Sequence, residues 1–403
     1  IGILTTPIVT RLYSPADFGI FTIFAAFIGI AGQISTMRYS VTIPLAETED
    51  IADNVIKLCL LITFSLSLLL YLAFLLFGDL FVARYAVPQA AKYLWLLPLC
   101  FLSAGLYETF STWAQRKKYF QIIARTSLSQ GISSAAIKIG LGWFGIKPLG
   151  LLFGLLVSQL AGTGSLFLKY IKEKPNFFRN LSWRSISHVA KRFHRFPLYQ
   201  TWSRLLLALG AQLPAILMAS FFGIKAAGLF GLAHSMISMP MNLVGQSVAK
   251  VYYAEIAQYG KARPDKILQL SKTIIKRMFF VGIIPMVVIM IASPWIFSLV
   301  FGKEWGDSGI YARLLAIIIL TRFIASPVAH CFDVMEMQGT QLFLNVVRVI
   351  MILIIFWVCS YFGFSSFTTI NIYSISMSIY YAFMIGVIIF SMKRLSYQYE
   401  RRD

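Results

Sequence analysis

The sequence predicts an all-α polytopic membrane protein, and three observations support this class. Hydrophobic residues make up 58% of the 403 positions and charged residues only 13%, about half the charged share of a soluble domain. The apolar residues gather in runs of about 20, the length of a helix that crosses a bilayer. These runs are continuous and do not alternate with polar residues, which excludes an outer-membrane β-barrel. An ordinary soluble enzyme and a disordered chain are excluded by the same composition.

Turn signals divide the apolar runs into twelve predicted crossings. Ser14-Pro15 and Phe222-Gly223 are examples of the pairs that stand in the gaps. The predicted crossings are 1–13, 17–38, 53–78, 93–115, 119–142, 147–170, 198–222, 226–248, 274–301, 310–335, 341–363 and 367–391. The chain opens at Ile1 inside an apolar segment, so we expect the first crossing to be incomplete and the N-terminus to be missing.

Basic residues orient the predicted crossings. The chain has 36 Lys and Arg against 16 Asp and Glu, a formal net charge of +20. With flanks counted, twenty-four basic residues fall on one side of the predicted membrane and six on the other. Such a bias marks the cytoplasmic side, which we therefore assign to the C-terminus. The positive charge is explained without a nucleic-acid partner.

The longest connection, residues 171–197, divides the chain into two predicted six-helix bundles, 1–170 and 198–403, the second ending in a basic tail. An even number of crossings in each half gives both halves the same orientation, related by a pseudo-two-fold axis along the membrane normal. A weak internal repeat agrees with this relation. Residues 17–21 (DFGIF) and 226–230 (AAGLF) each follow a short external turn, at an offset of 209.

The connection 171–197 is basic and amphipathic. Its Lys and Arg residues alternate with Phe177, Phe178, Trp183 and Phe193. A basic aromatic segment of this kind binds anionic lipid headgroups. We therefore predict a cytoplasmic linker on the anionic lipids of the inner leaflet, with a plain positively charged loop as the alternative.

Several arginines lie within the predicted spans, where a charge costs about 2.5 to 3.5 kcal/mol. Arg322 is about twelve residues into its crossing and close to the midplane. At 100° per residue, Ser326, Asp333 and Glu336 share its helix face. Because a guanidinium binds phosphate through two parallel hydrogen bonds, a cationic interior suits an anionic substrate. The predicted substrate-binding residues are Arg38, Arg204, Arg322, Arg348 and Arg125. Snorkelling from a helix end is the alternative, chiefly for Arg125 and Arg38.

Two carboxylates are candidates for the coupling ion, H⁺ or Na⁺. Glu108 lies well inside a predicted crossing of the first half, and Asp333 lies nearer the cytoplasmic side. A transport cycle needs a group whose charge state differs between its two conformations. A static ion pair with a neighbouring Arg or Lys is the alternative for either residue. The sequence has no Walker A motif, no HExxH motif and no cysteine pair at metal-binding spacing, so we expect no cofactor and no metal.

The opening TPIVTRLYSPADFGIFTIF (residues 6–24), the Arg38-Tyr39 pair and the acidic IPLAETED (43–50) resemble oligosaccharide flippases of the Wzx type. This resemblance implies the multidrug/oligosaccharidyl-lipid/polysaccharide exporter (MOP) fold, with two six-helix bundles around a cationic cavity. It implies an undecaprenyl-pyrophosphate-linked oligosaccharide as substrate, moved across the bacterial inner membrane by ion-coupled alternating access. It also implies a role in O-antigen, capsule or exopolysaccharide synthesis, beside a polysaccharide polymerase and a chain-length regulator.

Three other functions stay open. A drug or metabolite antiporter of the same superfamily would favour acidic residues in the cavity, whereas basic residues dominate here. A flippase for peptidoglycan precursors usually has additional helices. A membrane glycosyltransferase or polymerase needs a large external loop or a pair of catalytic carboxylates, and the sequence shows neither.

Overall fold

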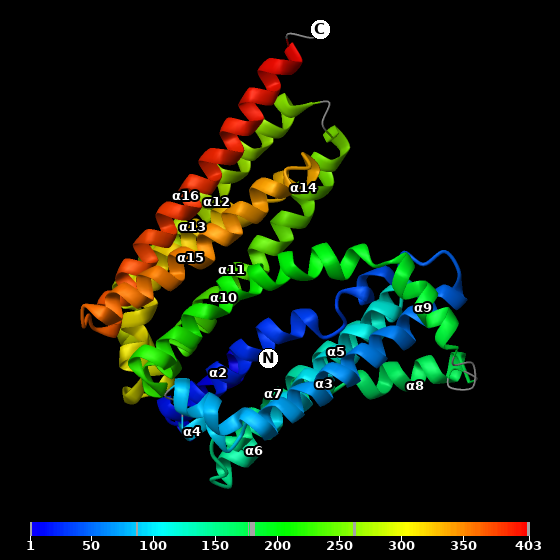
Figure 1. Cartoon of the computed structure of the whole chain (residues 1–403). Helices are drawn as coiled ribbons and strands as arrows, with labels where there is room; N and C mark the ends of the chain where they lie inside the picture. The colour runs from blue at the N-terminus through cyan, green and yellow to red at the C-terminus, as the bar shows by residue number, and fades with distance from the viewer. Residues whose placement is uncertain (1, 86–87, 176, 178–181, 261–262, 401–403) are drawn as a thin grey trace. The chain divides into compact units, whose positions relative to one another are not determined.

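The computed structural model describes residues 2–85, 88–175, 177, 182–260 and 263–400, and within them every regular element is a helix (Figure 1). The predicted all-α membrane class is thereby confirmed. The helices up to the middle of the chain are α1 (Gly2–Leu12), α2 (Pro15–Ala31), η1 (Gly32–Ile34), η2 (Tyr39–Thr42), α3 (Glu49–Tyr85), α4 (Pro88–Ala91), α5 (Leu96–Arg116), α6 (Phe120–Trp143), α7 (Leu149–Leu160), α8 (Thr163–Glu173), α9 (Trp183–Arg192), η3 (Phe196–Gln200) and α10 (Thr201–Phe222). The remaining helices are α11 (Ile224–Tyr259), α12 (Pro264–Phe301), η5 (Lys303–Trp305), α13 (Gly306–Val328), α14 (Cys331–Val334), α15 (Gln338–Tyr361) and α16 (Ser366–Glu400).

Eight helical segments of the described chain are long and apolar enough to cross a membrane. Helices α5, α6 and α11 are also long enough but too polar to be counted on composition alone. Serines and basic residues inside α6 illustrate the reason, since each lowers the mean hydropathy of its segment. The count of twelve crossings stays a prediction.

Contacts between residues divide the chain into two units, 1–228 and 229–403. In the first unit α10 packs against α2, where Gly29 leaves room for the side chain of Gln212. In the second unit α13 packs against α12 and α16, and α15 runs beside α16 (Figure 1). The division into bundles 1–170 and 198–403 stays a prediction.

Helix α2 begins at Pro15, two residues before the predicted crossing, and ends earlier than predicted. Ser14 and Asp17 form a capping box, in which the Ser14 hydroxyl accepts from the Asp17 amide and the Asp17 carboxylate accepts from the Ser14 amide. The predicted crossing 17–38 corresponds to the apolar segment Pro15–Ile34, in which the α-helix stops at Ala31 and η1 follows. The chain then passes through η1 and η2, with left-handed backbone at Met37 (φ 45°) and Arg38 (φ 61°).

Two other predicted crossings correspond to the single apolar segments Leu149–Glu173 and Lys303–Val334, but neither is one continuous α-helix. The crossing 147–170 divides into α7 and α8 because Gly162 has a positive φ of 89°. The crossing 310–335 divides because α13 ends at Val328, one residue after Pro327, and α14 follows as a separate turn. The helical phase that places Asp333 on the face of Arg322 therefore does not continue to that residue.

The linker forms a helix whose apolar face packs on the protein. Ile186 and Val189 of α9 join a buried cluster with Tyr39 and Val55, and the Tyr39 hydroxyl donates to the carbonyl of Ala190 (3.1 Å). Phe177 is buried in the same cluster and Phe193 packs against it, whereas Trp183 is exposed. Phe178 lies outside the described residues. The amphipathic pattern of α9 is thus accounted for by packing against α3 and η2, and contact with lipid stays a prediction for its outer face.

Candidate functional site: two arginine clusters

The irregular segment after α2 brings Arg38 to the side of α5. Its guanidinium Nη1 lies 3.3 Å from Oε1 of Glu108, which also accepts a 2.7 Å hydrogen bond from the Ser40 hydroxyl. Oε2 of Glu108 accepts from the Ser35 hydroxyl at 3.3 Å. Arg38 and Glu108 are both partly buried. The two residues that the sequence assigns to substrate and to coupling ion are therefore direct partners.

Buried hydroxyls hold this irregular segment in place. The Thr63 hydroxyl of α3 donates to the carbonyl of Ser35 (2.9 Å), and a Cβ on Gly105 of α5 would lie only 2.5 Å from the Thr63 side chain. Non-helical backbone at membrane depth is tolerated only where protein or a water-filled cavity satisfies it. Left-handed backbone at Arg38 is a strained conformation for a residue other than glycine. The fold thus maintains an unfavourable backbone to place this guanidinium.

Arg204 of α10 is the third charged group at this place. It lies within electrostatic range of Arg38, and its side chain is exposed. Among the described residues no carboxylate pairs with Arg204. Arg38, Glu108, Arg204, Ser35 and Ser40 are called the first cluster below.

Arg322 and Arg348 form a second cluster in the second unit. Arg348 of α15 is buried (7% exposed) and hydrogen-bonds to the hydroxyl of Tyr381 on α16. Arg322 of α13 is within electrostatic range of Tyr381, of Tyr373 and of His234 on α11. No ion pair to Arg322 is found in the part of the chain that the structure describes. Arg322, Arg348, Tyr373, Tyr381 and His234 are called the second cluster.

Two predicted site residues stand apart from both clusters. Arg125 is exposed on α6. Asp333 is exposed on α14, where its carboxylate lies 3.1 Å from Nδ1 of His330. Glu336, expected on the face of Arg322, is also exposed and has a left-handed backbone (φ 54°). The single polar face predicted for Arg322, Ser326, Asp333 and Glu336 is wrong, because the helix that would carry it ends at Val328.

Sequence reasoning missed the hydroxyl groups of both clusters. Tyr373 and Tyr381 are eight positions apart on α16, a spacing that returns to a similar helix face. That spacing could have indicated a shared polar face. Tyrosines are common at membrane interfaces, however, and have no charge that would distinguish these two as site residues. Ser35 and Ser40 gave no signal, since their positions depend on the helix ending at Ala31.

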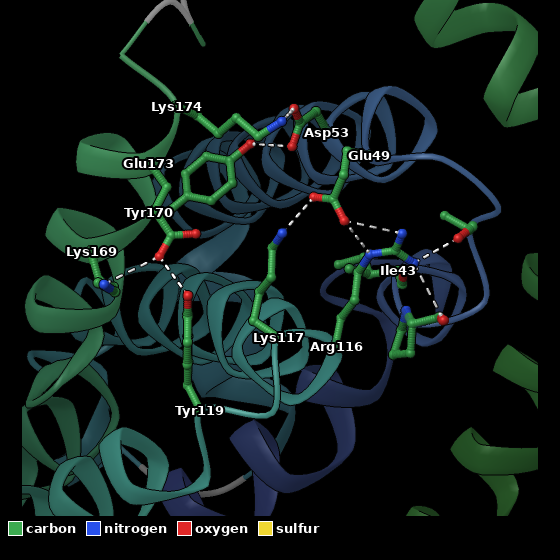
Figure 2. A network of polar contacts seen from close by, with 12 residues as sticks. Ile43, Glu49, Asp53, Arg116, Lys117, Tyr119, Lys169, Tyr170, Glu173 and Lys174 are labelled. Atoms are coloured by element: carbon green, nitrogen blue, oxygen red, sulfur yellow. Dashed lines mark hydrogen bonds and ion pairs between the residues drawn. The ribbon is translucent and has the colours of Figure 1, made fainter.

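A separate polar network ties the ends of α3, α5 and α8, on the side predicted to be cytoplasmic (Figure 2). Glu49 of α3 pairs with Arg116 (3.3 Å), the last residue of α5, and with Lys117 (2.8 Å), which follows it. Asp53 accepts a hydrogen bond from the Tyr170 hydroxyl (3.1 Å) and pairs with Lys174 (2.9 Å). These charged side chains are paired with one another. The network therefore connects the ends of α3, α5 and α8, and we call it the clamp.

Residues 8–309 match the family model described as a polysaccharide biosynthesis protein. The chain belongs to this family. It is 20% identical over 288 residues to the teichuronic acid biosynthesis protein TuaB of Bacillus subtilis, covering 70% of this chain and 57% of that protein. It is 24% identical over 337 residues to the succinoglycan biosynthesis transport protein ExoT of Rhizobium meliloti, covering 80% of this chain and 63% of that protein. The chain thus spans less than two thirds of the length of either relative.

Solved structures of the MOP superfamily have the same fold. A multidrug resistance transporter of the MATE family matches with a TM-score of 0.77 at 14% identity, covering 99% of this chain and 94% of that chain. The lipid II flippase MurJ matches with a TM-score of 0.75 at 15% identity, covering 98% of this chain and 88% of that chain. The predicted resemblance is confirmed at the level of family and fold.

Proposed function

We propose that this member of the polysaccharide biosynthesis family is a flippase for lipid-linked oligosaccharides. Its substrate is an oligosaccharide on a polyprenyl pyrophosphate, moved by alternating access across the bacterial inner membrane, with the linker and C-terminus cytoplasmic. The names of the relatives support polymers of the teichuronic acid and succinoglycan kind as readily as O-antigen. The polymer is therefore left at the level of an exported bacterial polysaccharide.

The observation that carries the proposal is the pair of arginine clusters within the membrane fold. Arg204 and Arg322 have no carboxylate partner among the described residues, so no ion pair there offsets either guanidinium inside its predicted span. A guanidinium binds pyrophosphate oxygens in bidentate geometry, and tyrosine and serine hydroxyls beside it add neutral donors. Such surroundings favour an anionic ligand and disfavour a cation.

The coupling ion is assigned to Glu108 first and to Asp333 second. Glu108 is partly buried among charged and polar groups that respond to its charge. Asp333 is exposed and its recorded partner is His330. We propose that H⁺ or Na⁺ binds at Glu108 during the cycle.

A drug or metabolite antiporter is the second candidate, because the fold also matches a multidrug transporter. Its cationic substrates would be repelled by Arg204 and Arg322, which makes it the weaker account.

The test is transport of a fluorescent pyrophosphate-linked lipid oligosaccharide by the purified chain in proteoliposomes. We expect flipping that accelerates when a proton or sodium gradient is imposed. Neutralising Glu108 should abolish the response to the gradient. Absence of flipping, together with uptake of cationic dyes, would support the antiporter instead.

A further inference from the structure

The Arg38–Glu108 pair has the composition of an occupied anion site. The Glu108 carboxylate accepts hydrogen bonds from one guanidinium and two serine hydroxyls, those of Arg38, Ser40 and Ser35. Guanidinium and hydroxyl groups bind phosphate oxygens with the same geometry that they use for carboxylate oxygens. The carboxylate of Glu108 thus lies where these donors would hold a phosphate group of a ligand.

Two features show that the site has more hydrogen-bond donors and positive charge than Glu108 alone engages. Nε of Arg38 is buried and has no hydrogen-bond acceptor among the described residues, and such orphaned donors are uncommon in folded proteins. Arg204 lies within electrostatic range of Arg38 and is exposed. One carboxylate neutralises one of these two guanidiniums, whereas a pyrophosphate carries enough charge for both.

We infer that Glu108 is a resident anion, which occupies the Arg38 site in the empty transporter and yields it to the substrate pyrophosphate. This inference rests on the proposed function and specifies how its first cluster works. Pyrophosphate oxygens replace the carboxylate oxygens as acceptors for Arg38 and Ser40. Glu108, left beside the incoming negative charge, takes up one proton from solvent, and no covalent bond forms or breaks.

Proton uptake and ligand binding are then linked in both directions, because coupling between two sites is reciprocal. Protonation of Glu108 releases Arg38 and strengthens ligand binding, so affinity rises as the pH falls. Within the described residues, Arg38 is ion-paired with Glu108, and Cys59 of α3 lies within electrostatic range of Glu108. Arg204 acts on the pair through Arg38. Cys59 is fully buried, which leaves Glu108 as the group able to exchange a proton with a ligand-accessible site.

The test measures binding of inorganic pyrophosphate and of farnesyl pyrophosphate to the purified full chain by calorimetry, at pH 6 and pH 8. Each titration is repeated in two buffers of different ionisation enthalpy, which gives the number of protons taken up. The variants are Glu108→Gln, Arg38→Gln, Arg322→Ala and the control Glu49→Gln, which removes a carboxylate that pairs with Arg116 and Lys117 in the helix-end network. Comparison of variants with wild type cancels the protonation of the ligand itself.

We expect Glu108→Gln to bind at least fivefold more tightly than wild type at pH 8 and to take up about one proton fewer. Arg38→Gln should bind at least tenfold more weakly, and Glu49→Gln should match wild type.

If Glu108→Gln keeps the affinity and proton uptake of wild type while Arg322→Ala weakens binding, the resident-anion role is wrong and the proposed function stands. If wild type binds neither compound, both the resident-anion role and the proposed function are overturned. Equal affinity for the two compounds assigns recognition to the pyrophosphate, and tighter binding of the farnesyl compound adds a contribution from the lipid chain.

Discussion

Gly19 of α2 and Gly228 of α11 meet in a reciprocal contact. A Cβ on Gly19 would lie 1.9 Å from the carbonyl oxygen of Ile224, and a Cβ on Gly228 would lie 1.8 Å from the carbonyl oxygen of Pro15. Both pairs of equivalent residues, Pro15 with Ile224 and Gly19 with Gly228, are separated by the 209 positions of the sequence repeat. A contact that recurs with its two partners exchanged is typical of residues beside a two-fold axis. The contact therefore joins equivalent positions of the sequence repeat.

Replacing either glycine should separate these two helices. Gly19→Ala and Gly228→Ala each place a methyl group against backbone, which cannot rotate away as a side chain can. Small residues allow close helix approach in membranes, so we expect each variant to lower the melting temperature in detergent by several degrees and the double variant to lower it further.

Gly140→Ala and Gly386→Ala are the matched controls for this prediction. Both glycines lie within helices, and a Cβ there would meet nothing within 4 Å. Alanine favours a helix over glycine by up to about 1 kcal/mol, so the controls should melt at or above the wild-type temperature. Equal melting of all four variants would show that the close approach of α2 and α11 is not required.

Arg322 should be needed for transport through its shape as well as its charge. Lysine keeps the charge and loses the planar fork that binds two oxygens at once. We expect Arg322→Ala to abolish polysaccharide display in a complementation assay and Arg322→Lys to retain a minor fraction. Arg313→Ala is the control on the same helix, since Arg313 is exposed and donates to the carbonyl of Ile291. Wild-type display by both Arg322 variants, at equal protein level, would remove Arg322 from the substrate path.

The predicted orientation can be tested by cysteine labelling of intact cells. All four native cysteines are free and buried, so the background should be low. We expect Ser187→Cys, on the exposed side of α9, to react with an impermeant maleimide only after the cells are permeabilised. Lys147→Cys, in the exposed turn between α6 and α7, should react in intact cells. The reverse pattern would invert the topology.

The sequence predicted the fold class and several helix boundaries because composition and turn residues are local signals. The Ser14-Pro15 pair marked the gap before α2, which begins at Pro15, two residues before the predicted crossing. The sequence did not predict the end of α2, because η1 and η2 depend on contacts of Ser35 with Thr63 and Glu108, which are distant in the chain. The same limit applies to Arg38 and Glu108. The sequence left an ion pair open for Glu108 but did not identify Arg38 as its partner.

The ion pair between Lys174 and Asp53 at the end of α8 should stabilise the protein equally at pH 7 and pH 9. The hydrogen bond to Asp53 raises the pKa of Lys174 above its ordinary value. A raised pKa means that the pair contributes fully below the unfolded pKa of about 10.4 and is lost as the pH rises through the higher folded pKa. Lys174→Gln should therefore lower the free energy of unfolding by about 0.5 to 1 kcal/mol, and by the same amount at pH 7 and pH 9.

Thermal unfolding in detergent at the two pH values measures the effect of Lys174→Gln, with Lys172→Gln as the control. Lys172 is exposed two positions earlier, and no ion pair to it is recorded among the described residues. The control should melt like wild type at both pH values, because its ammonium group is solvated in both states. A Lys174→Gln effect that shrinks between pH 7 and pH 9 would mean that the ammonium group loses its proton before its unfolded counterpart does. The pair with Asp53 would then not hold Lys174 in its charged form, and the connection of α8 to α3 would rest on the Tyr170 hydrogen bond and the surrounding apolar contacts.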